Sequence, residues 1–269
     1  MDNSFILKLQ KDDIKPRTDK KLARVASAFI KLFNSHNRFF KIKFKNDKWN
    51  RFFGIAHSEK YDSAENTLKD NMLCMEQAIN IYHLLSQTLA AGVPGDVVEL
   101  GCFKGTTSLL IQMTLDQNKS EKRLHVYDSF EGLPELSEKD ISVQTGKGSM
   151  KTTEDSLVEN FATYNVRLPE IHAGWFKDTL PSGLPQQISF AHLDGDLYSS
   201  IMESLMNVYP KLSKGAVVVI DDYCDPYVYE MNHLYPGVKK ACDEFFADKP
   251  EKVNVLIAGC KTHGYFRKE

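Results

Sequence analysis

The sequence predicts an α/β fold, a mostly parallel seven-stranded sheet with helices on both faces. Short apolar runs bounded by turn residues recur along the chain, and such runs are typical of buried parallel strands. Segments with helical periodicity separate them, and this alternation specifies a parallel sheet. The last two runs follow each other closely and predict a closing antiparallel hairpin. The seven expected strands are residues 96–100, 124–127, 171–173, 188–193, 216–220, 253–258 and 264–267.

Amphipathic segments between these runs predict the helices. Residues 71–90, for example, place Met75 and Ile79 among apolar residues at helical spacing. Thr152 and Asp155 stand in the spacing of a capping box, which predicts that a helix begins at Thr152. The expected helices are residues 71–90, 106–115, 152–164, the segment after residue 193 through Tyr209, and 238–247.

The composition excludes several classes of protein. A chain of 269 residues with 42% hydrophobic residues can form one large core, and its net charge of −2 predicts no nucleic-acid partner. Five dispersed cysteines without a CxxC pair disfavour a disulfide framework or a zinc site and indicate a reducing compartment. The first residues become charged too early for a signal peptide, and no apolar run approaches the ~20 residues of a membrane-spanning helix. We therefore expect a cytoplasmic protein without a membrane span.

Residues 1–60 differ in composition from the rest of the chain, which predicts an N-terminal arm followed by a main domain of residues 61–269. Between Arg38 and Arg51, basic residues alternate with aromatic and aliphatic ones. Such a stretch could contact an anionic partner or a membrane surface. The favoured interpretation is a helical arm that packs its aromatic residues on the main domain or on a second subunit. The arm therefore suggests a homo-oligomer.

A glycine-bearing turn joins the first expected strand to its helix. Gly101 and Gly105 let the backbone approach a ligand closely, and the helix that begins at Thr106 offers unpaired N–H groups. Asp128 ends the next strand, where it can accept hydrogen bonds from ribose hydroxyls. The turn lacks the Gly-x-Gly start of the dinucleotide fingerprint, and Glu99 would repel a diphosphate, so the pattern favours S-adenosylmethionine over NAD. The alternative is a tight turn with an incidental aspartate.

Two pairs of carboxylates follow the fourth and fifth expected strands. Asp194 and Asp196 follow one, and Asp221 and Asp222 follow the other. Open α/β sheets bind ligands at the carboxyl ends of their strands. Neighbouring carboxylates repel one another unless a cation lies between them, and oxygen ligands suit Mg²⁺, Ca²⁺ or Mn²⁺. The sequence therefore predicts a metal site at this edge.

Five short motifs occur in a fixed order along the chain. They are residues 95–105, 127–134, 193–198, 220–223 and 236–241, which read GDVVELGCFKG, YDSFEGLP, LDGDLY, IDDY and PGVKKA. With these motifs the chain resembles the macrocin O-methyltransferase family, which methylates sugars on macrolides. The resemblance covers about residues 60–269 and leaves the N-terminal arm outside. It implies a class I methyltransferase fold, S-adenosylmethionine, Mg²⁺ and methyl transfer to a hydroxyl of a sugar or glycosylated small molecule.

The resemblance also implies roles for individual residues. It places the metal on Asp194, Asp221 and Asp222. The expected cofactor-binding residues are Glu99, Gly101, Gly105, Thr106, Asp128 and Ser129. A sugar hydroxyl stays protonated at neutral pH, so a base must take its proton, and Asp194 is the leading candidate. His192 and Asp196 are weaker candidates, because His192 sits deeper in its strand and Asp196 can cap the next helix.

Two loops carry expectations of their own. The segment 223–236 contains Tyr227, Tyr229 and His233 and looks longer than the family usually has, so a macrolide acceptor does not carry over to this chain. The polar, glycine-bearing segment 138–151 is expected to be a mobile lid over the site or simple surface disorder.

Two other functions compete with methyl transfer. Asp194-Gly195-Asp196 is also an Asp-x-Asp turn, by which many glycosyltransferases hold a metal and a nucleotide-sugar diphosphate. That function leaves the turn at Gly101 and the second acidic pair unexplained. A catalytically inactive scaffold that binds S-adenosylmethionine is the non-enzymatic alternative, and the intact acids argue against it. The favoured function is therefore an S-adenosylmethionine-dependent O-methyltransferase.

Overall fold

The computed structural model describes residues 47–52, 73, 75–140, 145–224, 235–258 and 261–269. The chain divides into two compact units, one of Met1–Arg51 and Ile55–Tyr61 and the other of Phe52–Gly54 and Asp62–Glu269. Of the first unit, the described part is the beginning of helix α3 (Asp47–Phe52). The predicted arm therefore lies almost wholly outside the described residues, and its boundary near residue 60 stays a prediction.

The second unit is built on a seven-stranded sheet in the order β3-β2-β1-β4-β5-β7-β6. The neighbours from β3 to β5 pair in parallel, whereas β7 runs antiparallel to both β5 and β6. The strands are β1 (Asp96–Leu100), β2 (Leu124–Asp128), β3 (Glu170–Ala173), β4 (Ile188–Leu193), β5 (Leu212–Ile220), β6 (Asn254–Ala258) and β7 (Lys261–Arg267). This sheet confirms the predicted fold class, including the closing antiparallel hairpin.

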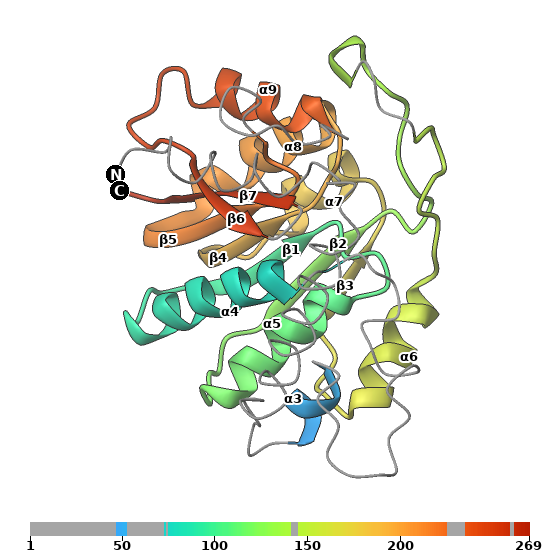
Figure 1. The fold of residues 1–269 in the computed structure, drawn as a ribbon, viewed down its shortest axis with the longest axis vertical. Coiled ribbons are helices and arrows are strands. Elements are labelled where there is room, and N and C mark those ends of the chain that lie inside the picture. The colour runs from blue at the N-terminus through green and yellow to red at the C-terminus, as the bar shows by residue number, and fades with distance from the viewer. Residues whose placement is uncertain (1–46, 53–72, 74, 141–144, 225–234, 259–260) are drawn as a thin grey trace, which may run out of the picture. The chain divides into compact units, whose positions relative to one another are not determined.

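Helices cover both faces of the sheet, with α4 and α5 on one face and α8 and α9 on the other (Figure 1). The helices are α4 (Met75–Ala90), α5 (Thr106–Gln117), α6 (Glu154–Tyr164), α7 (Phe176–Gly183), α8 (Tyr198–Val208) and α9 (Pro236–Phe245), with short 3₁₀ helices η1 (Glu138–Asp140) and η2 (Tyr209–Lys211). Sequence analysis did not predict α7, which is short and contains Pro181. Within the described residues, no helix combines the length and the apolar character that crossing a membrane requires.

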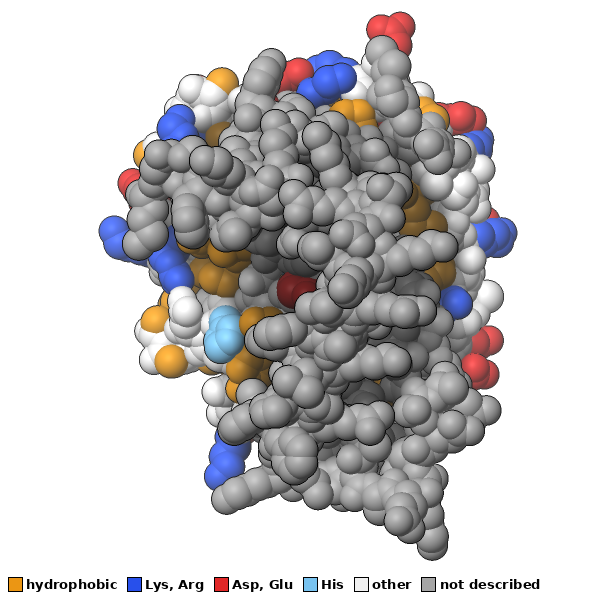
Figure 2. Space-filling model, viewed as in Figure 1, with side chains coloured by type: hydrophobic (Ala, Val, Ile, Leu, Met, Phe, Trp, Pro, Cys, Tyr) orange, Lys and Arg blue, Asp and Glu red, His pale blue; other side chains and the backbone are white. Residues whose placement is uncertain are grey.

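Charged side chains of both signs are interspersed around the described rim of one face, as Figure 2 shows. This mixture agrees with the near-balanced composition of 34 basic and 36 acidic residues. On the part of the surface that is described in this view, the side chains do not gather into a patch of one sign.

Successive residues of the central strands point to opposite faces of the sheet. Leu100, Leu193 and Ile220 belong to the apolar core that includes residues of α7, α8 and α9. Glu99 and His192 point to the other face, toward α4 and α5, and both side chains are buried. The sheet therefore has one apolar face and one face with buried polar groups near the strand ends.

The helix after the glycine-bearing loop begins later than the sequence predicts. The N-cap of α6 is Thr153, whose hydroxyl accepts a hydrogen bond from the N–H of Ser156 at 3.2 Å. Thr152 instead donates its own N–H to the carbonyl of Phe130 at 3.3 Å. The capping-box prediction at Thr152 is therefore wrong, because this residue is held by the segment that follows β2.

The described residues of the predicted lid segment fold against the domain on both sides of residues 141–144, which lie outside the described part. The N–H of Leu133 donates to the carbonyl of Ser149 at 2.8 Å, and the N–H of Gly148 donates to the carbonyl of Leu133 at 2.9 Å. Asp140 accepts a hydrogen bond from the N–H of Tyr198 at the start of α8, at 2.8 Å. These residues are hydrogen-bonded rather than disordered, and a lid function stays a prediction.

Candidate active site

Backbone hydrogen bonds continue past the ends of the central strands and bring the predicted site residues to one edge. The N–H of Gly101 donates to the carbonyl of Tyr127, and that of Asp194 to Leu100, both at 2.8 Å. The N–H of Asp221 donates to the carbonyl of Leu193 at 2.9 Å. The residues that directly follow β1, β4 and β5 therefore lie side by side.

Gly101 is required by this close approach. Its φ of +87° lies in the left-handed region, which favours glycine. A Cβ atom at this position would lie 1.8 Å from the carbonyl oxygen of Asp194. The glycine in the turn thus allows the ends of β1 and β4 to lie in contact.

A cavity of about 380 Å³ opens at this edge of the sheet. Of the predicted site residues, its lining includes Gly101, Asp128, Ser129, Asp194, Asp221 and Asp222. Glu99, Gly105 and Thr106 are not among the lining residues. The other lining residues are Phe103, Gly132, Leu133, Pro134, Met150, Trp175, Phe176, Gly195, Asp196, Ser200 and Tyr235.

Asp194, Asp221 and Asp222 form a group that we call the acid cluster. Each offers a carboxylate oxygen, and these oxygens lie within 4.8 Å of one another. Burial and the charges of Asp221 and Asp196 raise the pKa of Asp194 well above its ordinary value. A converging, all-oxygen donor set with excess negative charge fits a hard divalent cation such as Mg²⁺.

Two side chains outside the cavity lining hold Asp221 in place. Nε2 of Gln77, on α4, donates to Oδ1 of Asp221 at 2.7 Å. Nε2 of His263, on β7, lies 2.9 Å from the same oxygen. Sequence analysis missed both residues, because neither lies in a motif and Gln77 is 144 positions away from Asp221. The available signal for His263 was its place directly before the predicted strand 264–267, since Gly264 pairs with Ile220 at the end of β5.

Asp128 is fixed by backbone groups of the two turns beside it. Its Oδ2 accepts from the N–H of Phe103 and its Oδ1 from the N–H of Phe130, each at 2.8 Å. Burial raises the pKa of Asp128, and these N–H groups oppose that shift. Ser129 donates its hydroxyl to the carbonyl of Gly132 at 3.1 Å. The carboxylate is thereby oriented at the edge of the cavity.

Glu99 lies beneath the cavity and forms a buried polar group with neighbouring side chains. It accepts a hydrogen bond from the hydroxyl of Ser108, and Nδ1 of His192 lies 3.0 Å from its Oε1. Burial lowers the pKa of His192, but the bond with Glu99 outweighs this effect and raises it to about 9. His192 is 1% exposed, so it lies below the cavity rather than in it.

Gly105 and Thr106 serve the start of α5. Gly105 is the N-cap of that helix with a φ of +80°, and a Cβ atom on it would lie 2.9 Å from the side chain of Leu157 on α6. These two residues therefore set how the turn joins α5 and how α6 packs beside it.

Aromatic side chains form much of the remaining wall, and sequence analysis did not predict the contribution of α7. Trp175 is the N-cap residue of that helix and Phe176 its first residue. Tyr235 precedes α9, and burial together with the charge of Asp196 raises its pKa to about 12. Tyr227, Tyr229 and His233, from the segment that looks longer than the family usually has, lie outside the described residues.

The first turn of α8 is capped from a distance. Its N-cap residue, Leu197, makes no side-chain cap, and the N–H of Tyr198 donates to Asp140. Asp196 lines the cavity instead and has a φ of +59°. Sequence analysis considered Asp196 as the cap of this helix. In the structure Asp140 accepts the hydrogen bond from the N–H of Tyr198 instead.

The chain matches a known family over most of its length. A sequence model described as Macrocin-O-methyltransferase (TylF) matches residues 4–250. This range corrects the expected extent of about residues 60–269, because the match begins within the N-terminal arm and ends before the closing hairpin. The arm therefore does not lie outside the family's sequence pattern.

Curated relatives and solved structures agree with this match. The 8-demethyl-8-(2,3-dimethoxy-alpha-L-rhamnosyl)-tetracenomycin-C 4'-O-methyltransferase of Streptomyces olivaceus is 33% identical over 175 residues, 62% of this chain and 67% of that protein. The mycinamicin III 3''-O-methyltransferase of Micromonospora griseorubida is 30% identical over 189 residues, 66% of this chain and 74% of that protein.

The structure of the O-methyltransferase NovP superposes with a TM-score of 0.62 at 26% sequence identity. The superposition covers 82% of this chain and 88% of NovP. The family match and the curated relatives lead to one conclusion: the chain belongs to the macrocin O-methyltransferase family and is an O-methyltransferase.

Proposed function

We propose that this protein transfers the methyl group of S-adenosylmethionine to a hydroxyl of a sugar or glycosylated small molecule, with Mg²⁺ held by Asp194, Asp221 and Asp222. The observation that carries the proposal is the acid cluster, which lies in the same cavity as Asp128. The names of the two curated relatives support the acceptor class, since one names a rhamnosyl compound and both place the methyl group on a numbered hydroxyl.

In this proposal the cofactor lies along the ends of β1 and β2. Asp128 is oriented to accept hydrogen bonds from ribose hydroxyls, and Ser129 and the backbone of Gly101 lie beside it. Leu133 and Pro134 offer an apolar wall for the adenine ring. Glu99, Gly105 and Thr106 act by shaping the turn, since they do not line the cavity.

When bound, S-adenosylmethionine supplies an activated methyl group, and Mg²⁺ supplies a Lewis acid that lowers the pKa of an acceptor hydroxyl. The chain has to orient the acceptor, exclude water and accept its proton. We assign the proton to a carboxylate oxygen of Asp194, because this carboxylate belongs to the acid cluster and lines the cavity.

Trp175, Phe176 and Tyr235 form an apolar and amphipathic wall for the acceptor in this proposal. A sugar ring presents C–H groups on its faces and hydroxyls on its edge, so it can pack on an aromatic side chain while one hydroxyl faces the acids. Cytoplasmic location and self-association stay predictions.

The test is a methyl-transfer screen with the full chain and radiolabelled S-adenosylmethionine over sugars, glycosides and phenols. We expect transfer to a sugar or glycoside, loss of activity in EDTA and recovery with added Mg²⁺. Asp222→Asn should lose transfer while retaining S-adenosylmethionine binding by calorimetry. Full activity in chelator would contradict the proposed dependence on Mg²⁺. Transfer to phenols alone would contradict the proposed sugar acceptor.

The glycosyltransferase alternative is tested in the same preparation. A glycosyltransferase would bind a nucleotide-sugar diphosphate in the presence of Mg²⁺, whereas our proposal predicts no measurable binding. Calorimetry with UDP-glucose and with S-adenosylmethionine separates the two.

A further inference from the structure

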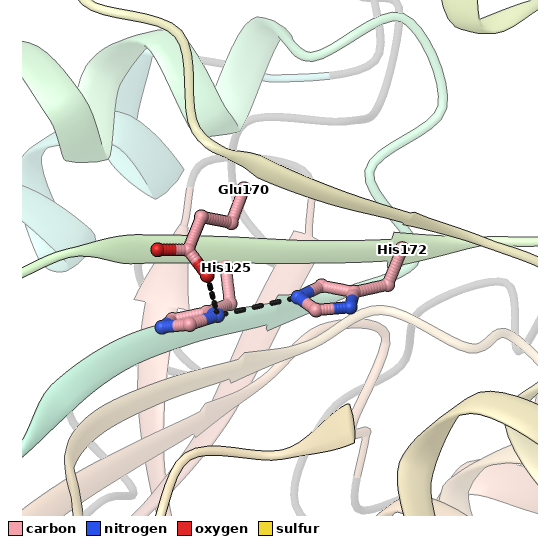
Figure 3. A group of neighbouring side chains, drawn as sticks. All are labelled: His125, Glu170 and His172. Atoms are coloured by element: carbon pink, nitrogen blue, oxygen red, sulfur yellow. Dashed lines mark hydrogen bonds and ion pairs between the residues drawn. The ribbon is translucent and has the colours of Figure 1, made fainter. Parts of the chain in front are cut away.

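A second group of potential metal ligands lies on the edge strand β3 and its neighbour β2, away from the carboxyl ends that carry the acid cluster. It consists of His125, Glu170 and His172, which we call the histidine cluster. In the parallel register of these strands, His125 lies beside Glu170 and Tyr127 lies beside His172. All three side chains of the cluster therefore lie on the same face of the sheet, and Figure 3 shows them turned toward one another.

The three ligand atoms are spaced as a small metal ion requires. Nδ1 of His125 lies 3.2 Å from Nε2 of His172 and 3.2 Å from Oε2 of Glu170. Metal bonds of about 2.0–2.1 Å in a tetrahedron put neighbouring ligand atoms about 3.3 Å apart. These two separations match the spacing of ligand atoms in a zinc site.

Each member of the histidine cluster is held by a further contact. Nε2 of His125 lies 3.5 Å from Oδ2 of Asp96 without a hydrogen bond between them, on the side where a carboxylate commonly orients a metal-binding histidine. Nη1 of Arg123 donates to Oε1 of Glu170 at 2.9 Å, and Nη2 of the same side chain contacts Asp96 at 2.8 Å. This arrangement leaves Oε2 of Glu170 directed at His125.

The rings of the cluster are also fixed by stacking. His172 stacks on Tyr127, with ring centroids 4.4 Å apart and an interplanar angle of 6°. Burial and the neighbouring His125 lower the pKa of His172 below its ordinary value. The ligand side chains are therefore oriented before any ion binds.

His125 lies between two carboxylates, both of which also contact Arg123. Its two ring nitrogens face carboxylates on opposite sides, Asp96 at 3.5 Å and Glu170 at 3.2 Å. A neutral imidazole carries one N–H, so one nitrogen would present a lone pair to a carboxylate. Arg123 bonds both carboxylates, and a metal ion bound between Nδ1 of His125 and Oε2 of Glu170 would place a second countercharge there.

We propose that His125, Glu170 and His172 bind a divalent transition-metal ion, with Zn²⁺ as the best match. Imidazole nitrogen favours Zn²⁺ over Mg²⁺, whereas the acid cluster offers oxygen alone, so the two sites select different ions. The sequence prediction that disfavoured a zinc site rested on the dispersed cysteines, and the histidine cluster contains no cysteine. A metal here would link the edge strand β3 to β2.

The experiment is a zinc titration of the metal-free full chain in excess Mg²⁺, which occupies oxygen sites. We expect calorimetry to give one Zn²⁺ per chain and Co²⁺ to give the visible absorption of a nitrogen-bound tetrahedral ion. Zinc should also raise the midpoint temperature of unfolding in a concentration-dependent way.

Variants assign the binding to these residues. His172→Asn and Glu170→Gln should abolish the cobalt spectrum, and Asp96→Asn should weaken zinc binding by about 10- to 100-fold. His83→Asn, at an exposed histidine on α4, is the matched control and should bind zinc like the parent. If His172→Asn does not fold, Glu170→Gln at the more exposed position carries the test. Absence of zinc binding in Mg²⁺, or unchanged binding in the Glu170→Gln variant, would overturn the proposal.

Discussion

Asp194, which is half-buried in the wall of the cavity, and Glu251, which is buried, have pKa values that shift in opposite directions. Burial and neighbouring acids raise the pKa of Asp194 well above its ordinary value. Burial alone would raise the pKa of Glu251 as well, but hydrogen bonds from Lys268 and Tyr209 lower it to about 2. The difference is the partner that the fold provides.

At Glu251 the fold supplies the countercharge. The ammonium of Lys268 lies 2.6 Å from Oε1, and the hydroxyl of Tyr209 donates to Oε2 at 2.7 Å. At Asp194 the ionisable groups that shift its pKa are mainly other carboxylates. A cluster of like charges costs stability, and the proposed function accounts for it by a cation bound among these acids.

Gly101→Ala should displace Asp194 and have the largest effect of the changes considered. The new Cβ atom would lie 1.8 Å from the carbonyl oxygen of Asp194, so the ends of β1 and β4 must separate. We expect a loss of at least about 3 kcal/mol in the free energy of unfolding and loss of methyl transfer. Urea denaturation and the transfer assay measure both.

Gly92→Ala is the matched control for Gly101→Ala. Gly92 also has a positive φ, +64°, but a Cβ atom there has no neighbour within 4 Å among the described residues. It should cost only the backbone strain, about 1 kcal/mol. Equal losses in the two variants would contradict the role given to the contact with Asp194.

Lys268→Met tests the paired side of the comparison through pH. Because the folded pKa of Glu251 lies at about 2, below its ordinary 4.5, this carboxylate contributes stability that is complete above about pH 4.5 and is lost as pH falls toward 2. The contribution is up to about 3 kcal/mol. We expect the variant to be less stable at pH 6 and to lose less stability between pH 6 and pH 3 in urea denaturation.

The control for Lys268→Met is Lys147→Met, which removes the same charge from an ion pair with Glu135 on the surface. Both partners of that pair are exposed, so its contribution should be below about 1 kcal/mol. If the pH dependence of Lys268→Met follows that of the control, the assignment to Glu251 is wrong.

The strand ends could be predicted from sequence because apolar runs and the acids after them are local signals. The prediction brought Asp128, Asp194, Asp221 and Asp222 to one edge, and the cavity lining includes all four. The cap of α8 could not be predicted from local sequence. Asp140, rather than Asp196, accepts the hydrogen bond from the N–H of Tyr198, and it comes from another part of the chain.

The contacts that sequence analysis missed depend on tertiary structure. Gln77 reaches Asp221 only because α4 packs on the same face of the sheet, and His263 does so through the antiparallel register of β5 and β7. Trp175 and Phe176 belong to α7, a short helix with a proline, in which apolar residues do not form a long stripe. In each case the signal was weak because the partner lies far away in sequence.

Gln77→Met tests what an uncharged hydrogen-bond donor contributes to the acid cluster, because it removes the bond from Gln77 to Asp221. Without its hydrogen bond, Oδ1 of Asp221 loses orientation, and residues that orient metal ligands typically contribute 10- to 100-fold in affinity. We expect the Mg²⁺ concentration for half-maximal transfer to rise by about 10-fold or more, with activity recovered at saturating Mg²⁺. Gln112→Met, at a buried glutamine on α5 that bonds Asp116, should leave the Mg²⁺ dependence unchanged.

The carboxylate of Asp140 is buried and is satisfied by backbone N–H groups, rather than by a charged side chain as in Glu251. Its replacement should have the smallest effect. The side chain is 2% exposed and accepts hydrogen bonds from the N–H groups of Ser137 and Tyr198. Asp140→Ala leaves the first turn of α8 without this cap and should cost about 1 kcal/mol, whereas Asp140→Asn retains an acceptor and should cost less. Glu138→Ala, at an exposed position of the same 3₁₀ helix, should change stability by no more than about 0.5 kcal/mol. If thermal unfolding shows that Asp140→Asn loses as much stability as Asp140→Ala, the negative charge matters more than the hydrogen bond, and backbone N–H groups would then stabilise a buried carboxylate mainly through charge, as Lys268 does for Glu251.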